Sequence, residues 1–196
     1  MAGKSCGLIC VIPPELQVEW AGRLPESVKR FRPAALILRG PYSAGAKDII
    51  AAAKPFDLAI LLENDIEAAL QTAATGLFFS APGGDDVAKA RAHLGSAVVI
   101  GTACGLSRHA AMESAEAGAD FIAFDARDSK NWDQAADLCS WWDETTVVPG
   151  ALFCGSALPG GAILDKARAD FVILEEAAKA TESLTFAKEL GLQSQT

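Results

Sequence analysis

The sequence predicts a closed (β/α)8 barrel (a TIM barrel of the α/β class), and two observations carry this prediction. Short apolar runs, often β-branched, alternate with alanine-rich segments of helical periodicity. The apolar runs lack polar alternation, which is typical of parallel strands that are buried on both faces. Eight strand–helix pairs close naturally into one barrel, so we expect a single domain over residues 1–196 with a loose tail at 193–196.

The expected strands begin 19 to 28 residues apart, which leaves room for one helix after each strand. They are GLICVI (7–12), AALILR (34–39), DLAILL (57–62), GLFFSA (76–81), AVVIGT (97–102), DFIAFD (120–125), VPGALFC (148–154) and DFVILE (170–175). The expected helices occupy residues 18–31, 46–54, 65–74, 85–95, 107–118, 131–144, 160–168 and 180–191. An open doubly wound sheet is the alternative, and it is disfavoured because no GxGxxG motif follows the first strand.

Polar residues and glycines mark the expected helix ends. Pro25 weakens the prediction of the first helix. The expected N-caps are Asp65, Asp85 or Asp86, Ser107 and Asn131, and the expected C-terminal stops are Gly95 and Gly118.

Composition argues against several classes of partner. The net charge is −8 and no basic stripe occurs, which disfavours nucleic acid. No apolar run approaches the roughly 20 residues that span a membrane. The first apolar run ends at 13–14 in two prolines without a cleavage pattern, so we expect a first strand, no signal peptide and a cytoplasmic protein. The five cysteines form no CxxC pair and are expected to be reduced and structural. The oligomeric state stays open, with a homo-oligomer among the options.

In this architecture functional side chains lie at the C-terminal ends of the strands. Arg39 closes the second expected strand, where an arginine can hold a phosphate or form a salt bridge to an acid such as Glu63. Asn64 and Asp65 follow the third strand. Asp65 can cap the next helix, and one of its oxygens can also face a magnesium ion, so the two roles are compatible.

Two later segments offer further candidates. Lys130 ends the polar loop DARDSK and is either a ligand-binding residue or an ordinary solvated lysine. The glycine-rich stretch CGSALPGG at 154–161 contains Gly155 and Ser156, and such stretches often bind phosphate in these barrels. His93 and His109 lie on expected helices and are predicted to be surface residues.

Three stretches, in their order along the chain, resemble a known family. They are LILRG (36–40), LLENDIEAAL…TGLFF (61–79) and VVIGTACGLSRHAAMESAEAGADFIAFDA (98–126). Together they resemble thiamine phosphate synthase and its thiazole tautomerase relatives over roughly residues 34–175. The resemblance implies a small barrel that joins hydroxymethylpyrimidine diphosphate to thiazole phosphate with Mg²⁺ and releases pyrophosphate. The implied partner is therefore a small phosphorylated molecule.

The resemblance also implies roles for individual residues. Arg39 matches the arginine that grips the diphosphate, and Asn64 and Asp65 match an Asn-Asp pair whose aspartate helps to bind Mg²⁺. Lys130 resembles the lysine after strand six. Gly155, with Ser156 beside it, falls near the family's phosphate glycines. On this basis Arg39, Asn64 and Lys130 are the catalytic candidates.

The chain departs from the family pattern at several positions of the implied site. The second strand has Ile37 and Pro41 where the family has a glutamine and a lysine. Gly83 lies near the place of a second metal-binding acid, which Asp85 or Asp86 could replace only if the loop bends inward. The remaining departures are Ala103 or Cys104 in place of a serine, and Glu175 and Glu176 in place of a small hydroxyl-bearing turn.

The acidic residues after the last strand have the largest electrostatic consequence. A carboxylate about 5 Å from a phosphate charge costs roughly 3 kcal/mol per charge pair at an effective dielectric near 20. Three hypotheses therefore stay open. The chain is a divergent synthase with reduced or lost activity, a repurposed ligand-binding barrel, or an isomerase or tautomerase that uses Glu63, Asp125 or Cys104 as its base.

Overall fold

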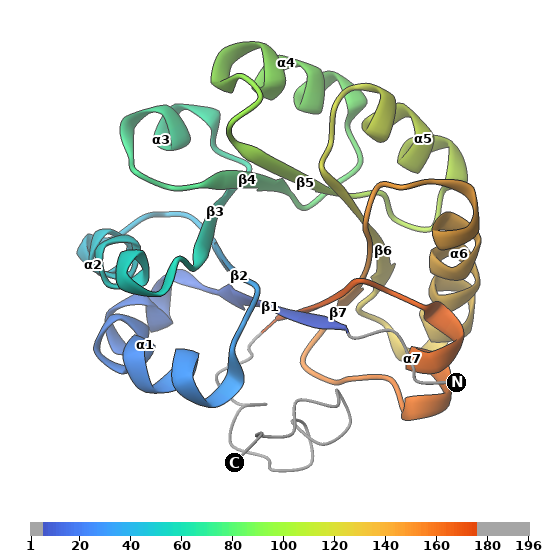
Figure 1. Ribbon diagram of the computed structural model, residues 1–196, viewed down its shortest axis with the longest axis horizontal. Helices are drawn as coiled ribbons and strands as arrows, with labels where there is room; N and C mark the ends of the chain where they lie inside the picture. The colour runs from blue at the N-terminus through green and yellow to red at the C-terminus, as the bar shows by residue number, and fades with distance from the viewer. Residues whose placement is uncertain (1–5, 176–196) are drawn as a thin grey trace.

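The computed structural model describes residues 6–175, which form a closed barrel of eight parallel strands (Figure 1). The strands are β1 Gly7–Ile12, β2 Ala35–Leu38, β3 Ala59–Glu63, β4 Gly76–Phe79, β5 Val99–Ala103, β6 Phe121–Ala126, β7 Gly150–Cys154 and β8 Phe171–Leu174. They follow one another around the barrel in chain order, and β8 pairs with β1 to close it. The predicted barrel is confirmed.

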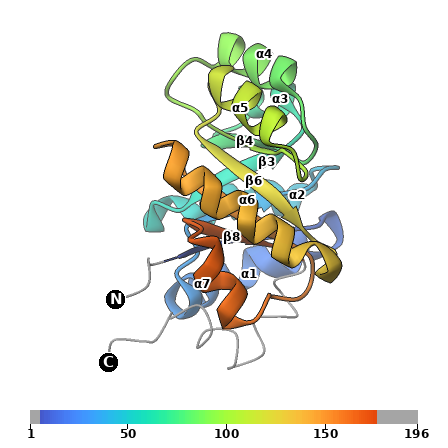
Figure 2. The same ribbon diagram turned by 90° about the vertical axis from the view of Figure 1, so that its right-hand side faces the viewer.

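A ring of helices covers the outside of the barrel, as Figures 1 and 2 show. The α-helices are α1 Gln17–Phe31, α2 Ala44–Ala53, α3 Ile66–Gln71, α4 Gly84–Leu94, α5 Arg108–Glu116, α6 Trp132–Thr145 and α7 Gly161–Ala167. Three 3-10 turns are η1 Pro14–Leu16, η2 Lys54–Phe56 and η3 Ser129–Asn131. The helix expected at 180–191 and the tail at 193–196 lie outside the described residues. Within residues 6–175, no helix is both long and apolar enough to cross a membrane.

Most helix ends follow the predicted chemistry. Asp65 and Ser107 accept hydrogen bonds from the backbone of the first turn, and Gly95 ends α4. The prediction for the start of α4 is wrong, because Gly83 is its N-cap and Asp85 and Asp86 lie in the first turn. Carboxylates there face the positive end of the helix dipole and are stabilised without acting as caps.

Two helices differ from expectation in other ways. α1 continues through Pro25. α3 ends at Gln71, before the expected residue 74. The Thr75 side chain accepts a hydrogen bond from Ile60 N at 2.7 Å and donates one to Ile60 O at 3.1 Å. These two bonds hold the chain beside β3, so the helix has no room to continue.

The interior of the barrel is apolar and is filled by aliphatic side chains together with phenylalanine rings. It contains every second residue of the strands: Ile9, Val11, Ala35, Ile37, Leu61, Phe78, Ala103, Phe121, Ala123, Ala151, Phe153 and Ile173. Phe78 stacks on Phe121 with ring centroids 5.9 Å apart and meets Phe153 edge-on at 5.5 Å. Gly101 makes room for this packing, because a Cβ at that position would overlap the Phe121 ring. The large rings fill the barrel, so any ligand must bind above them, at the mouth.

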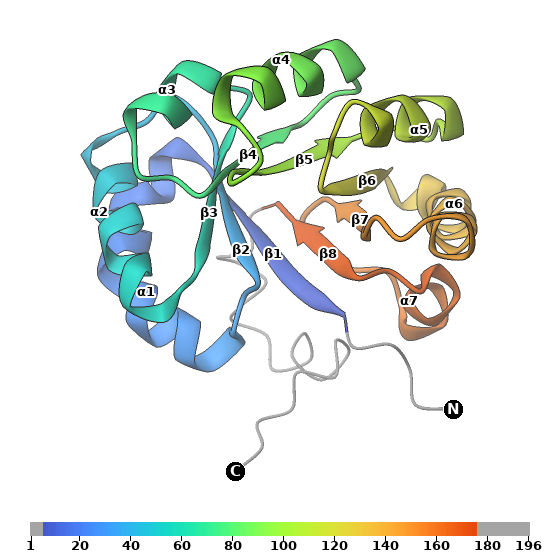
Figure 3. The ribbon, with the colours of Figure 1, turned by 45° about the horizontal axis from the view of Figure 1, so that its top comes forward.

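A second, larger apolar layer separates the strands from the helices. Its members include Leu8, Leu36, Leu62 and Trp142, all almost fully buried. Figure 3 shows the strands at the centre with the helices around them, and β1 lies beside β8 where the barrel closes. This layer fixes the strand ends, and the strand ends place the side chains of the mouth.

Candidate functional site at the barrel mouth

One step of strand alternation beyond the apolar interior produces a layer of positions at the C-terminal ends of the strands, five of which have polar side chains. Each of its positions lies two residues after an interior residue. They are Pro13, Arg39, Glu63, Ser80, Gly105, Asp125, Gly155 and Glu175. Glu63 and Asp125, two of the three predicted candidate bases, belong to this layer, as does the predicted Arg39.

Arg39 is held by two carboxylates at the centre of one side of the mouth. Its Nε donates to Glu63 Oε2 at 2.7 Å and its Nη2 to Glu63 Oε1 at 3.2 Å. Nη2 also donates to Glu175 Oε1 at 2.8 Å. These hydrogen bonds, first of all those with Glu63, raise the pKa of Arg39 further above its ordinary value, although partial burial opposes the shift. The salt bridge predicted as one alternative for Arg39 is confirmed, and its role toward a diphosphate stays a prediction.

Neutral groups fix the backbone around this arginine. Gln17 is fully buried, and its Nε2 donates to Arg39 O at 2.8 Å while its Oε1 accepts from Ser43. The Tyr42 hydroxyl donates to Glu63 O at 2.9 Å. Burial, with the nearby charges of Asp65 and Glu63, raises the pKa of Tyr42, so this hydroxyl remains a donor at neutral pH. These hydrogen bonds therefore hold the backbone of both Arg39 and Glu63 in place.

Asn64 and Asp65 follow β3 and make local contacts. Asn64 has a φ of 55°, a left-handed conformation that asparagine tolerates better than most residues. Its amide exchanges two hydrogen bonds with Ser80, at 2.7 Å and 3.0 Å. Asp65 Oδ1 accepts from Ala68 N at 2.8 Å. The predicted helix cap is confirmed, and the metal role of Asp65 stays a prediction.

A second arginine, Arg127, lies at the mouth and was missed from the sequence. It donates from Nε and Nη2 to the two oxygens of Asp125, at 3.0 Å and 2.7 Å. Its guanidinium lies 4.6 Å from the centre of the Phe153 ring, at the top of the apolar interior. The hydrogen bonds from Arg127 lower the pKa of Asp125. The sequence does contain a signal for Arg127. It lies two residues after Asp125, and because strand residues alternate with a period of two, its side chain is expected on the same side as that of Asp125.

The glycine-rich loop after β7 has a packing explanation. A Cβ on Gly155 would lie 3.0 Å from Arg127 O, so glycine allows the loops after β6 and β7 to approach each other. Ser156 is exposed, and α7 begins only at Gly161. The phosphate-binding role of Gly155 and Ser156 stays a prediction.

Lys130 lies apart from the Arg39 network. Its Nζ meets Asp128 Oδ2 at 2.6 Å, and its side chain is 76% exposed. This contact is local to η3 and raises the pKa of Lys130. The structure thus places Lys130 in a solvated loop, one of the two alternatives predicted for it.

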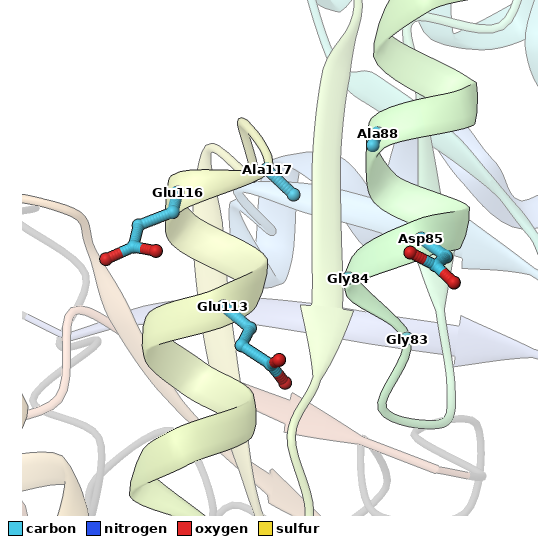
Figure 4. A pocket seen from close by; sticks show the side chains of 7 residues that line it. All are labelled: Gly83, Gly84, Asp85, Ala88, Glu113, Glu116 and Ala117. Atoms are coloured by element: carbon cyan, nitrogen blue, oxygen red, sulfur yellow. The ribbon is translucent and has the colours of Figure 1, made fainter.

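The described residues fit a magnesium ion poorly. Within residues 6–175, no three His, Cys, Asp or Glu side chains gather in a way that could hold a metal. Asp85 lines a hollow of about 410 Å³ between α4 and α5, together with Glu113 and Glu116 (Figure 4), and Asp86 lies 3.6 Å from Lys89. Neither acid is thus bent into the mouth beside Asp65 as a substitute ligand. Magnesium sites usually combine carboxylates with substrate phosphates, and Asp65 is left as a single candidate ligand.

Cys104 is a poor candidate for a catalytic base. It is fully buried, and burial raises the pKa of its thiol to about 11. Its Sγ lies 3.7 Å from Ser114 Oγ, inside the layer between strands and helices. The other two candidate bases, Glu63 and Asp125, are each held by an arginine.

Comparison with known proteins shows which proteins this chain resembles. No known family profile matches the chain. The thiamine-phosphate synthase of Erythrobacter litoralis is 32% identical over 128 residues, which cover 62% of this chain and 60% of that protein. The thiamine-phosphate synthase of Rhodospirillum centenum is 31% identical over 123 residues, or 59% and 58% of the two chains. The chain is thus similar to thiamine-phosphate synthases over about 60% of its length. The predicted resemblance is therefore confirmed.

The similarity to thiamine-phosphate synthases covers only part of each chain. The chain spans about 60% of the length of the curated relatives that it matches. A solved thiamine phosphate pyrophosphorylase from Pyrococcus furiosus superposes with a TM-score of 0.72, covering 96% of this chain and 97% of that one, at 15% identity. At this identity the superposition shows that the two proteins share a fold.

Proposed function

We propose that this chain is a divergent thiamine-phosphate-synthase-like barrel in which the standard condensation is strongly reduced or lost. That reaction joins hydroxymethylpyrimidine diphosphate to thiazole phosphate. The observation that carries the proposal is the double hydrogen bonding of Arg39 by Glu63 and Glu175. The residue that resembles the family's diphosphate grip is already neutralised by the protein itself.

A diphosphate would have to compete with these carboxylates for Arg39. Glu63 is almost completely buried and holds the guanidinium through two bonds, so it stays in place when a ligand arrives. At about 5 Å and an effective dielectric near 20, each pair of like charges costs roughly 3 kcal/mol. Since about 1.36 kcal/mol corresponds to a tenfold change in rate, one such pair suffices for a loss of about a hundredfold.

Other replacements act in the same direction. Pro41 stands where a lysine would add positive charge, and Gly83 stands near the place of a second metal-binding acid. Asp65 is the residue that the resemblance assigns to Mg²⁺, and its Oδ1 already caps α3. Magnesium would supply charge neutralisation to a departing pyrophosphate, and the described residues give it little support.

The alternative is a repurposed ligand-binding barrel of the same family. It is favoured by the charge balance at Arg39 and Arg127, since both guanidiniums are paired without any substrate. In either case we propose a small molecule as the partner, phosphorylated in the first case. We also propose a cytoplasmic setting and one domain for the whole chain.

The test is product formation from both substrates at saturating concentration with Mg²⁺. We expect little or no thiamine phosphate from the unmodified protein, and robust turnover would contradict the proposal. The double variant Glu175→Ser, Glu176→Ala removes the two acids after β8, of which Glu176 lies outside the described residues. A matched control, Glu113→Ser with Glu116→Ala, removes two acids from the hollow between α4 and α5. A gain in phosphate binding in the first variant alone would support the electrostatic argument.

A further inference from the structure

The two carboxylates that hold Arg39 are not equivalent. Glu63 makes two hydrogen bonds to the guanidinium, and its side chain is 6% exposed. Glu175 makes one hydrogen bond, and its side chain is 25% exposed. Glu63 is therefore the buried, doubly bonded partner at the mouth, whereas Glu175 is the outer partner that solvent can reach.

The charged groups around Glu175 come from several strands. Arg39 approaches it from the end of β2, and Arg127, from the end of β6, exerts a further attraction. Each of these arginines already has a carboxylate of its own, Glu63 or Asp125. On the neighbouring strand β7, burial raises the pKa of Cys154 to about 12, so its thiol stays neutral between pH 5 and 8. Two guanidiniums, Arg39 and Arg127, thus face three carboxylates, and Glu175 is the one in excess.

We propose that Glu175 occupies, on Arg39, the position of a ligand's oxyanion. A singly charged oxyanion, such as a carboxylate or a sulfonate, displaces Glu175 from the guanidinium, and the displaced side chain turns toward solvent. The inference rests on the proposed function, since it concerns the same mouth. It adds the charge of the ligand and the place on Arg39 where the ligand binds.

The charge follows from what remains in the mouth after the exchange. A monoanion replaces one negative charge on Arg39 by another, and the contact with Glu63 is unchanged. A dianion adds a second negative charge beside Glu63, which cannot move away because it is buried and held twice. The mouth should therefore prefer monoanions to dianions.

The experiment compares methanesulfonate, a monoanion, with sulfate, a dianion, at pH 7. Binding to the full chain is followed by NMR through the Nε–H signal of Arg39. We expect the unmodified protein to bind methanesulfonate more tightly than sulfate. Glu175→Gln removes the competing charge and should bind methanesulfonate more tightly than the unmodified protein does. Glu116→Gln, the matched control, should bind methanesulfonate as the unmodified protein does.

Two results would overturn the inference. One is methanesulfonate binding that is no tighter in Glu175→Gln than in the unmodified protein. The other is tighter binding of sulfate than of methanesulfonate, which would contradict the preference for a single charge. Both readouts are independent of condensation. Rapid thiamine phosphate formation together with tighter methanesulfonate binding in Glu175→Gln would end the proposed function and leave this inference standing.

Discussion

The two sides of the mouth use the same chemical pair in different ways. On one side Arg39 joins residues 24 and 136 positions away in the chain, Glu63 and Glu175. On the other side Arg127 holds Asp125, only two positions away. In both Arg39–Glu63 and Arg127–Asp125, the guanidinium donates hydrogen bonds to both oxygens of the carboxylate. The difference teaches that sequence separation, together with burial, decides what such a pair does for the barrel.

The Arg39 side connects three strands across the closure of the barrel. Arg39 follows β2, Glu63 ends β3 and Glu175 follows β8, while β1 lies between β2 and β8. The hydrogen bonds of Arg127 to Asp125 stay within one strand end, and its guanidinium covers the Phe153 ring. Loss of the first contact should therefore affect the whole barrel, and loss of the second should affect one loop.

The largest expected effect is that of Arg39→Gln. This change leaves the buried carboxylate of Glu63 without its cation, which typically costs about 3 kcal/mol of the free energy of unfolding. Urea denaturation measures the loss. Arg127→Gln is the matched control and should cost less than about 1 kcal/mol, because its partner is more exposed. Equal losses in the two variants would break the comparison.

The next largest effect is that of Gly155→Ala on the Arg127 side. The new Cβ would lie 3.0 Å from Arg127 O, and a backbone atom cannot move away as easily as a side chain can. Overpacking of this kind costs about 1 to 2 kcal/mol, measured by thermal or urea unfolding. Gly160→Ala is the control, since nothing lies within 4 Å of the Cβ that it adds. If Gly155→Ala left the free energy of unfolding unchanged, the loops after β6 and β7 would not be closely packed.

A smaller effect is expected when pH is lowered. The pKa of Asp125 is lower in the folded chain than its ordinary value of 3.8, so its pair with Arg127 stabilises the fold fully above that value. The stabilisation is lost as the pH falls from 3.8 toward the lowered pKa, and for a pair this exposed it amounts to at most about 1 kcal/mol. Comparing the unmodified protein with Asp125→Asn at pH 6 and pH 3 measures it. A difference between the two proteins that grows toward pH 3 would contradict the assignment.

The smallest effect is expected for Lys130→Ala. Lys130 and Asp128 are both solvent-exposed, so their contact should leave the melting temperature unchanged. The same variant also separates structure from ligand binding. Weaker phosphate binding at an unchanged melting temperature would support the predicted binding role, and a drop in melting temperature would show that the loop carries more of the fold than its exposure indicates.

Local chemistry made much of the fold predictable. The apolar strands, their spacing and the caps at Asp65 and Ser107 depend on neighbours within a few residues, and the sequence shows these directly. One of the predictions that were wrong involves a longer distance. The early end of α3 depends on Thr75 bonding back to Ile60, 15 residues away.

The candidate site divides along the same line. The sequence by itself placed Arg39, Asn64 and Asp65 at the mouth, because strand ends in a parallel barrel all point the same way. It also placed Glu175 at the end of the last strand. Only the tertiary structure decided that Glu175 meets Arg39, because their contact depends on the closure of β8 against β1. The register of eight strands sets that closure, and no stretch of sequence shorter than the whole barrel contains it.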